Sequence, residues 1–149
     1  MIVLDASIVI AAVVADEPLH TQVQAQFVRW QKHEEQFIAP PLYHAEVTAV
    51  CRKLVIQQRY SPIDAREILM QMLTFPVEIM NHQSLYLRAY DLANAYALSR
   101  AYDTQYIALA ELYACTCWTA DQRLVNTVSR SLPFVHWIGE AISDRPFRA

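Results

Sequence analysis

Two aspartates closely follow short apolar runs that are typical of buried strands. Asp5 comes directly after residues 2–4, and Asp121 comes just after residues 116–119. In an open parallel sheet the carboxyl ends of the strands meet at one edge, where ligands bind. An ionised group after a buried strand is costly unless it is paired or bound to a cation. The two carboxylates are therefore expected to converge at one site.

Two further acids stand in segments that are otherwise largely apolar. Asp103 begins a helical segment that runs to residue 111, and Glu46 is the acidic residue within residues 43–50. Clustered carboxylates raise one another's pKa unless a divalent cation neutralises them. Oxygen ligands with no nearby Cys or His pair suit Mg²⁺ or Mn²⁺, and such an ion can activate a water at a phosphorus atom. The chemistry predicted for these acids is phosphodiester hydrolysis.

Each of these acids also has a structural explanation when it is taken alone. Asp103 and Asp121 stand where helices are expected to begin, and an Asp there is commonly an N-cap. Glu46 could form an ion pair with Arg52 or Arg59. The metal site is favoured by the four acids together rather than by any one of them.

The elements that must position these side chains indicate an α/β fold. Five apolar runs are short enough to be buried strands, at residues 2–4, 37–39, 77–79, 116–118 and 134–137. Between them apolar residues recur at helical spacing, and Ser7 and Ser61-Pro62 mark helix starts. Alternation of strands and helices implies a parallel sheet covered on both faces. We expect one domain over residues 1–149.

Composition excludes several other classes of protein. The net charge of -3 gives no general attraction to nucleic acid, so local cations would have to contact phosphate. The one glycine, Gly139, excludes the glycine-rich Walker and dinucleotide loops. Three cysteines fit a reducing cytoplasm, and no signal peptide or apolar run long enough to span a membrane is evident. A cytoplasmic protein without membrane association is expected.

Taken in chain order, these segments resemble the PIN-domain ribonucleases, of the kind found as VapC toxins in toxin–antitoxin pairs. The resemblance is carried by residues 2–7 (Ile-Val-Leu-Asp-Ala-Ser), residues 16–18 (Asp-Glu-Pro), the Glu46 helix, residues 102–111 and residues 118–124. It covers nearly the whole chain. The fold that it implies is a three-layer α/β/α sandwich with a central parallel sheet of about five strands.

The resemblance also implies roles for individual residues and for partners. The catalytic pocket of a Mg²⁺- or Mn²⁺-dependent endoribonuclease would be formed by Asp5, Glu46, Asp103 and Asp121. Asp5 and Asp103 would be the direct metal ligands, while Ser7 and Thr119 would hold carboxylates or waters beside them. A homodimer is implied as well, together with an antitoxin protein that blocks the pocket.

Basic residues near the acids are candidates for contacts with RNA. The chain has ten Arg and two Lys, and the planar guanidinium suits phosphate. Arg52, Lys53 and Arg59 follow Glu46 on the same expected helix and could contact the RNA backbone. An ordinary solvated helix face is the alternative.

Three other functions remain open at this stage. The fold could serve as a catalytically inactive binding module, with the acids acting as helix caps. A phosphatase or receiver domain also places an Asp after a strand, but the phosphatase pattern needs a second Asp where Ser7 stands, and both need a late lysine, while none follows Lys53. A nuclease of this kind could also cut structured RNA or DNA flaps.

Overall fold

The computed structural model describes residues 1–140, which are built around a parallel sheet of five strands. The strand order is β3-β2-β1-β4-β5, and every neighbouring pair is parallel. The strands are β1 (Ile2–Leu4), β2 (Phe37–Ala39), β3 (Val77–Ile79), β4 (Thr116–Thr119) and β5 (Val135–Trp137). They lie within one residue of the predicted runs, so the predicted parallel α/β fold is confirmed.

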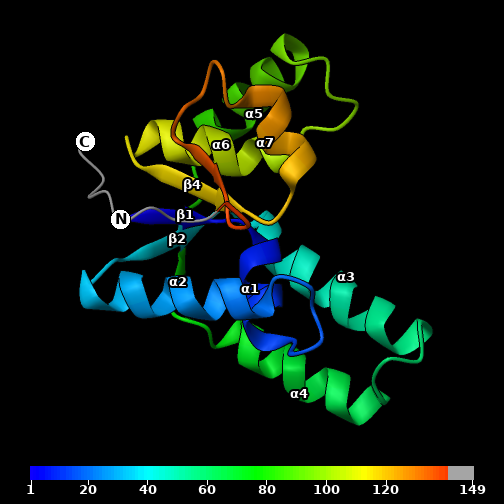
Figure 1. The fold of residues 1–149 in the computed structure, drawn as a ribbon. Coiled ribbons are helices and arrows are strands. Elements are labelled where there is room, and N and C mark those ends of the chain that lie inside the picture. Colours follow the sequence, from blue (N-terminus) through cyan, green and yellow to red (C-terminus); the bar gives the residue numbers. More distant parts are fainter. Residues whose placement is uncertain (141–149) are drawn as a thin grey trace.

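Helices cover both faces of this sheet. In residues 1–140 they are α1 (Ala6–Val13), α2 (His20–Lys32), α3 (Leu42–Ile56), α4 (Pro62–Leu73), α5 (Gln83–Ala95), α6 (Asp103–Leu112) and α7 (Gln122–Val128). Figure 1 shows α1 to α4 below the sheet and α5 to α7 above it. This arrangement is the three-layer α/β/α sandwich that the sequence predicted.

Strand β1 lies at the centre of the sheet and of the hydrophobic core. It pairs with β2 on one side and with β4 on the other. Val3 on β1, Ile8 on α1 and Ile107 on α6 are all fully buried, because helices from both layers pack against this strand. The carboxyl end of β1 is consequently enclosed by neighbouring elements, and any polar group placed there must be satisfied locally.

Four helices end in a left-handed residue that is not glycine. Helices α2, α3, α5 and α6 are followed by Glu34, Gln58, Ala97 and Ala114, with φ of 52°, 59°, 51° and 48°. The backbone N–H of each donates to a carbonyl in the last turn of the helix before it. Glycine is the usual residue at such a position, because a Cβ is strained there. These helix ends are therefore closed by hydrogen bonds despite that strain.

Two sequence predictions concern the extent and setting of the chain. The prediction of one domain over residues 1–149 remains a prediction, and residues 141–149 lie outside the described residues. Within residues 1–140, no helix has both the length and the apolar character needed to cross a membrane.

Candidate active site

Asp5 occupies the junction between β1 and α1 and caps that helix. Its Oδ1 accepts from the backbone N–H of Ser7 at 3.1 Å, and its Oδ2 accepts from Thr119 Oγ1 at 2.5 Å. The helix begins at Ala6, so Asp5 is the N-cap and Ser7 lies inside the first turn, one residue from the predicted start. Burial of the side chain, which is 7% exposed, raises the pKa of Asp5 to about 6. Burial therefore destabilises the ionised form of Asp5 relative to the protonated form.

The ends of β1 and β4 are joined by hydroxyl groups. Thr119 Oγ1, which donates to Asp5, accepts from the backbone N–H of Asp121 at 3.0 Å. Ser7 Oγ accepts from the backbone N–H of Ala120 at 3.0 Å and lies 3.5 Å from Thr119 Oγ1. Ser7 and Thr119 thus hold the Asp5 carboxylate beside the turn that leads into α7. This placement agrees with their predicted supporting role, which remains a prediction.

Asp103 and Asp121 begin two different helices and influence each other. Asp121 is exposed and caps α7, with Oδ1 accepting from the backbone N–H groups of Arg123 and Leu124 at 2.8 and 3.1 Å. Asp103 is half-buried at the start of α6, and its pKa is raised by burial and then by repulsion from Asp121. Arg100 offsets part of this rise in the pKa of Asp103.

Glu46 reaches the same region from α3. Burial raises its pKa to about 7, and repulsion from Asp5 and Asp103 adds to the rise. The hydroxyl of Tyr106, a buried residue on α6, donates to Glu46 Oε2. Arg52 and Arg59 were the partners considered for Glu46 from the sequence, and neither of them pairs with it. A tyrosine three residues after Asp103, in a run of aliphatic residues, is the signal that could have indicated this contact.

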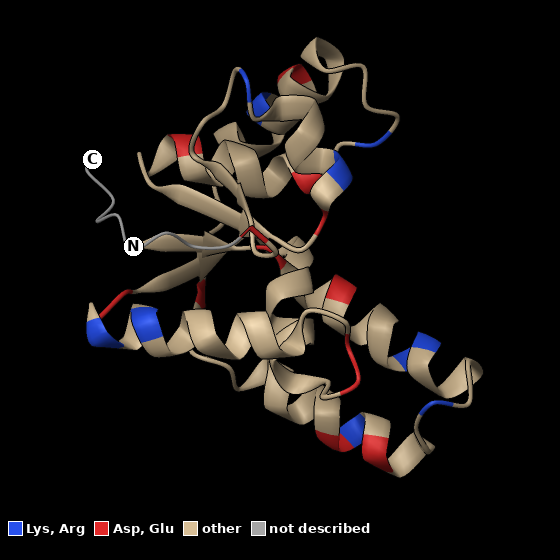
Figure 2. Cartoon of the chain, viewed as in Figure 1, with Lys and Arg blue, Asp and Glu red and all other residues tan. Residues whose placement is uncertain are grey.

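The four acids predicted from the sequence come from elements that meet near the middle of the domain: Asp5 follows β1, Asp121 follows β4, and Glu46 and Asp103 lie on α3 and α6. Acidic positions, drawn in red, gather near the centre of Figure 2. Asp5, Glu46 and Asp103 influence one another electrostatically, and Asp121 joins them through Asp103. None of the four forms an ion pair with Lys or Arg in the described part of the chain. Carboxylate donors of this kind suit a hard divalent cation.

The geometry limits how many of these acids could bind one ion directly. Among residues 1–140, no three His, Cys, Asp or Glu side chains lie close enough together to hold a metal. Direct coordination in this arrangement would therefore involve fewer than three of the acids, with the remaining ligands supplied by water. Mg²⁺ is commonly bound in this way, through one or two carboxylates and several waters.

The basic residues predicted to contact RNA have different surroundings. Arg59 lies after α3, which ends at Ile56, and not on that helix as predicted. Its guanidinium binds Asp16 at 2.9 Å and Glu17 at 2.8 Å, in the loop between α1 and α2. Lys53 lines a cleft that also includes Ser7, and Arg52 is exposed on α3. Their contacts with RNA remain predictions, and the ion pairs of Arg59 give it a structural role as well.

The fold and the acidic cluster define an α/β domain suited to phosphodiester hydrolysis. The family model described as "PIN domain" matches residues 2–128, and the chain belongs to this family. Membership confirms the predicted resemblance and leaves the phosphatase and receiver alternatives without support.

Comparisons with individual proteins agree with the family. The chain is 30% identical, over 133 residues, to a VapC ribonuclease of Mycobacterium bovis and to ribonuclease VapC9 of Mycobacterium tuberculosis. Each alignment covers 89% of this chain and 95% of the relative. The chain therefore spans nearly the full length of these relatives.

Solved structures share the fold at lower sequence identity. A toxin–antitoxin complex from Klebsiella pneumoniae matches with a TM-score of 0.65 and 18% identity, covering 94% of this chain and 99% of that one. VapC20 of Mycobacterium tuberculosis, described as a toxin that cleaves the sarcin–ricin loop, matches with a TM-score of 0.62 and 12% identity. That match covers 89% of this chain and 96% of VapC20. At such identities the likeness establishes the fold alone.

Proposed function

We propose that this protein is a Mg²⁺- or Mn²⁺-dependent endoribonuclease and the toxin of a toxin–antitoxin pair. One observation carries the proposal: Asp5, Glu46 and Asp103 share one end of the sheet, repel one another and have no Lys or Arg ion partner within residues 1–140. A divalent cation would relieve that repulsion. The ribonuclease names of relatives that align over nearly their whole length support the choice of substrate.

Asp5 and Asp103 are the proposed direct ligands of the ion. The hydrogen bonds from Ser7 and Thr119 fix the Asp5 carboxylate, and supporting groups of this kind orient ligands in metal sites. When bound, the ion would supply positive charge to the phosphate and lower the pKa of a coordinated water. Asp121, which is exposed beside Asp103, adds negative charge at the rim of the pocket.

Glu46 is the proposed proton acceptor. A general base works best when its pKa is near the working pH, and in the metal-free protein burial raises the pKa of Glu46 toward neutral pH. Tyr106 donates to Glu46 Oε2, which leaves Oε1 to receive a proton from the water that attacks phosphorus. Tyr106 is in this proposal a positioning residue, since it acts through Glu46.

Cleavage of labelled single-stranded RNA in the presence of Mn²⁺ tests this function. The wild-type protein should cut the RNA, and Asp5→Asn should reduce the rate by about a hundredfold or more, because loss of several kcal/mol of charge stabilisation has that effect. Asp91→Asn, a change of an exposed acid on α5, is the matched control. Equal activity of wild type and Asp5→Asn would reject the catalytic assignment and favour a PIN-fold binding module.

Substrate form and partners belong to the same proposal. Structured RNA and DNA flaps remain alternatives to single-stranded RNA, and a panel of labelled RNAs and DNAs would separate them. An antitoxin that covers the pocket, a homodimer and a cytoplasmic location are proposed from the family. Light scattering of the purified protein would test the homodimer, for which the exposed apolar residues Leu87 and Tyr90 on α5 offer contact surface.

A further inference from the structure

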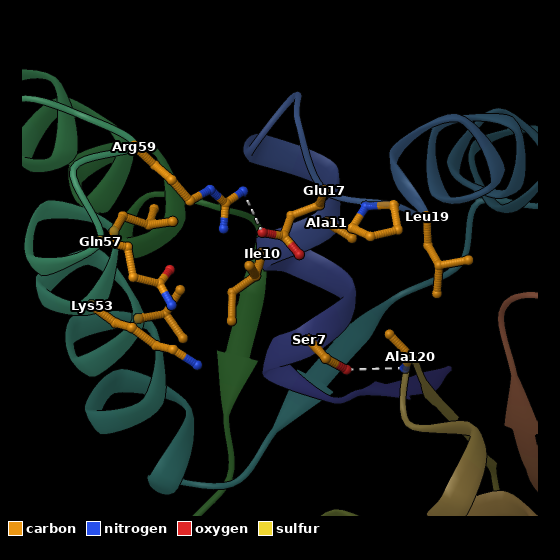
Figure 3. A pocket seen from close by; sticks show the side chains of 12 residues that line it. Ser7, Ile10, Ala11, Glu17, Leu19, Lys53, Gln57, Arg59 and Ala120 are labelled. Carbon is orange, nitrogen blue, oxygen red and sulfur yellow. Dashed lines mark hydrogen bonds and ion pairs between the residues drawn. The ribbon is translucent and has the colours of Figure 1, made fainter.

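A cleft of about 440 Å³ is lined mainly by residues of helices α1 and α3 and of the loop after α1 (Figure 3). One end is formed by Ser7 and Ala120, which are hydrogen-bonded to each other beside Asp5. The other end is formed by Glu17 and Arg59, whose ion pair joins the loop after α1 to the end of α3. The cleft therefore extends directly away from the site at which a phosphate would be cut.

One face of α3 connects the acidic cluster to this cleft. Glu46, Val50, Lys53 and Gln57 follow one another at spacings of three or four residues, so they share a face of the helix. At 1.5 Å per residue, Lys53 lies about 10 Å and Gln57 about 16 Å along the axis from Glu46. A chain that lies along this face would pass from the proposed proton acceptor to a cation and then to an amide.

The charges in the cleft distinguish Lys53 from Arg59. Arg59 is neutralised by Asp16 and Glu17, whereas Lys53 forms no ion pair in the described part of the chain. In Figure 3 the Lys53 side chain extends from α3 toward α1, across the cleft. An unpaired ammonium group beside a phosphodiester-cleaving site is suited to bind a neighbouring phosphate.

The walls of the cleft suit the base of a nucleotide. Ile10, Leu19, Val50 and Leu54 supply apolar surface, which can pack against the face of a base. The amide of Gln57 also lines the cleft and can both donate to and accept from the edge of a base. A volume of about 440 Å³ falls within the range of small-ligand pockets.

We propose that this cleft binds the nucleotide next to the scissile phosphate in single-stranded RNA. Lys53 binds the phosphate of that nucleotide, the apolar wall packs against its base, and Gln57 contacts the base edge. A single strand is required, because only an unstacked base can enter such a cleft. The inference rests on the proposed ribonuclease function, but it concerns binding and is testable without cleavage. RNA is favoured over a peptide because one end of the cleft, at Ser7, adjoins Asp5, and because Lys53, which lines the cleft, has no ion pair within residues 1–140 and can bind a phosphate.

Fluorescence anisotropy with labelled oligouridylate and oligoadenylate tests the role of Lys53. The measurements use Asp5→Asn protein in EDTA, so that no RNA is cut. Adding Lys53→Gln should weaken binding about fivefold and reduce the slope of log affinity against log salt by about 0.7, the value for one phosphate contact on a single strand. Lys32→Gln, which changes the other lysine, at the far end of α2, should leave affinity and slope unchanged.

The same assay tests Gln57. Gln57→Ala should alter the ratio of the affinities for oligouridylate and oligoadenylate while leaving the salt slope unchanged, because Gln57 is assigned to the base and not to phosphate. Gln71→Ala on α4 is the matched control, and thermal melts confirm that each variant is folded.

Three outcomes overturn the inference. Equal weakening by Lys53→Gln and Lys32→Gln would show a diffuse charge effect, and an unchanged base ratio in Gln57→Ala would remove the base contact. Undiminished RNA binding by Lys53→Gln would show that Lys53 does not contact RNA and would favour a peptide as the ligand of the cleft. Failure of the ribonuclease function is distinguishable, because wild-type protein would then not cut RNA even where these binding effects are found.

Discussion

Helix α6 carries an acidic residue at each end, and the two lie in opposite environments. Glu111, near the carboxyl end, accepts hydrogen bonds from two nitrogens of the Arg88 guanidinium, Nε at 2.6 Å and Nη2 at 3.0 Å. Asp103, at the amino end, has no Lys or Arg ion pair among residues 1–140 and has a raised pKa. One helix therefore contains one acid that forms an ion pair with an arginine and one that forms none within residues 1–140.

The same contrast distinguishes the acids at the two ends of α1. Asp16 accepts from Arg59 and from the Tyr60 hydroxyl, and these hydrogen bonds lower its pKa. Asp5, at the other end of the helix, receives only uncharged donors, and its pKa rises to about 6. Asp16 therefore has a cation from the chain, whereas no Lys or Arg pairs with Asp5 within residues 1–140.

The largest expected effect is on the rate of RNA cleavage, compared between variants at the two ends of α6. Asp103→Asn should reduce RNA cleavage by about a hundredfold or more, because it removes a proposed ligand of the metal. Glu111→Gln should leave the rate within about twofold, because it disrupts only an exposed ion pair. Rates are measured with labelled RNA and Mn²⁺ under single-turnover conditions. Equal losses in the two variants would remove the functional distinction between these acids.

Divalent cations should stabilise the protein through the unpaired acids alone. At Mn²⁺ concentrations a hundredfold above Kd, binding adds about 2.7 kcal/mol of stability, which corresponds to a rise in Tm of about 5 °C or more. Glu111→Gln should retain this rise, and Asp5→Asn should lose it. The measurement is thermal unfolding with and without Mn²⁺, and an undiminished rise in Asp5→Asn would place the ion elsewhere.

The raised pKa values predict how stability without metal depends on pH. Between the ordinary values of 3.8 and 4.5 and the folded values of about 6 and about 7, Asp5 and Glu46 keep protons that the unfolded chain releases. The folded state then binds more protons, so stability falls as pH rises from about 4 to about 7, by at most about 5 kcal/mol.

Urea unfolding in EDTA measures this fall. Burial lowers the pKa of His136, which makes stability rise with pH over part of the same range. The decisive quantity is therefore the difference between wild type and Asp5→Asn. The variant should show a smaller loss of stability on going from pH 5 to about pH 7. A larger loss of stability in the variant would contradict the raised pKa of Asp5.

The smallest effect should come from the paired acids. Arg88→Gln leaves Glu111 without its partner, but both side chains are partly exposed, so the cost in stability should be at most about 1 kcal/mol. Added salt should reduce the difference from wild type, because exposed charges are screened. A urea midpoint shifted as far as that expected for metal binding would show that this pair matters more than its exposure implies.

Most of the fold was predictable from the sequence, because its signals are local. Apolar runs of three or four residues located all five strands, and Ser61 with Pro62 marked the start of α4 correctly. The order of the strands was not predicted, because the sequence of a short run such as residues 77–79 does not indicate which strands it pairs with. The first helix begins at Ala6 rather than at Ser7, because Asp5 itself serves as the cap.

The proximity of the four acids was predictable from the sequence, but their hydrogen-bond partners were not. Asp5 and Asp121 were placed together by the rule that parallel strands end at one edge. The Tyr106 contact with Glu46 joins residues 60 positions apart, and a buried tyrosine on an apolar helix looks the same in sequence with or without such a contact. The ion pairs of Arg59 with Asp16 and Glu17 were not predictable for a similar reason, since they depend on how a distant loop folds back.

The hydrogen bond between Thr119 and Asp5 spans 114 positions of the chain. The central strand of the sheet is thus the earliest in the sequence, while the group that holds its terminal carboxylate comes after all but one of the strands. A ribosome must release almost the whole polypeptide before this pair can meet. Fragments and stalled translation products that stop before β4 therefore lack the assembled site.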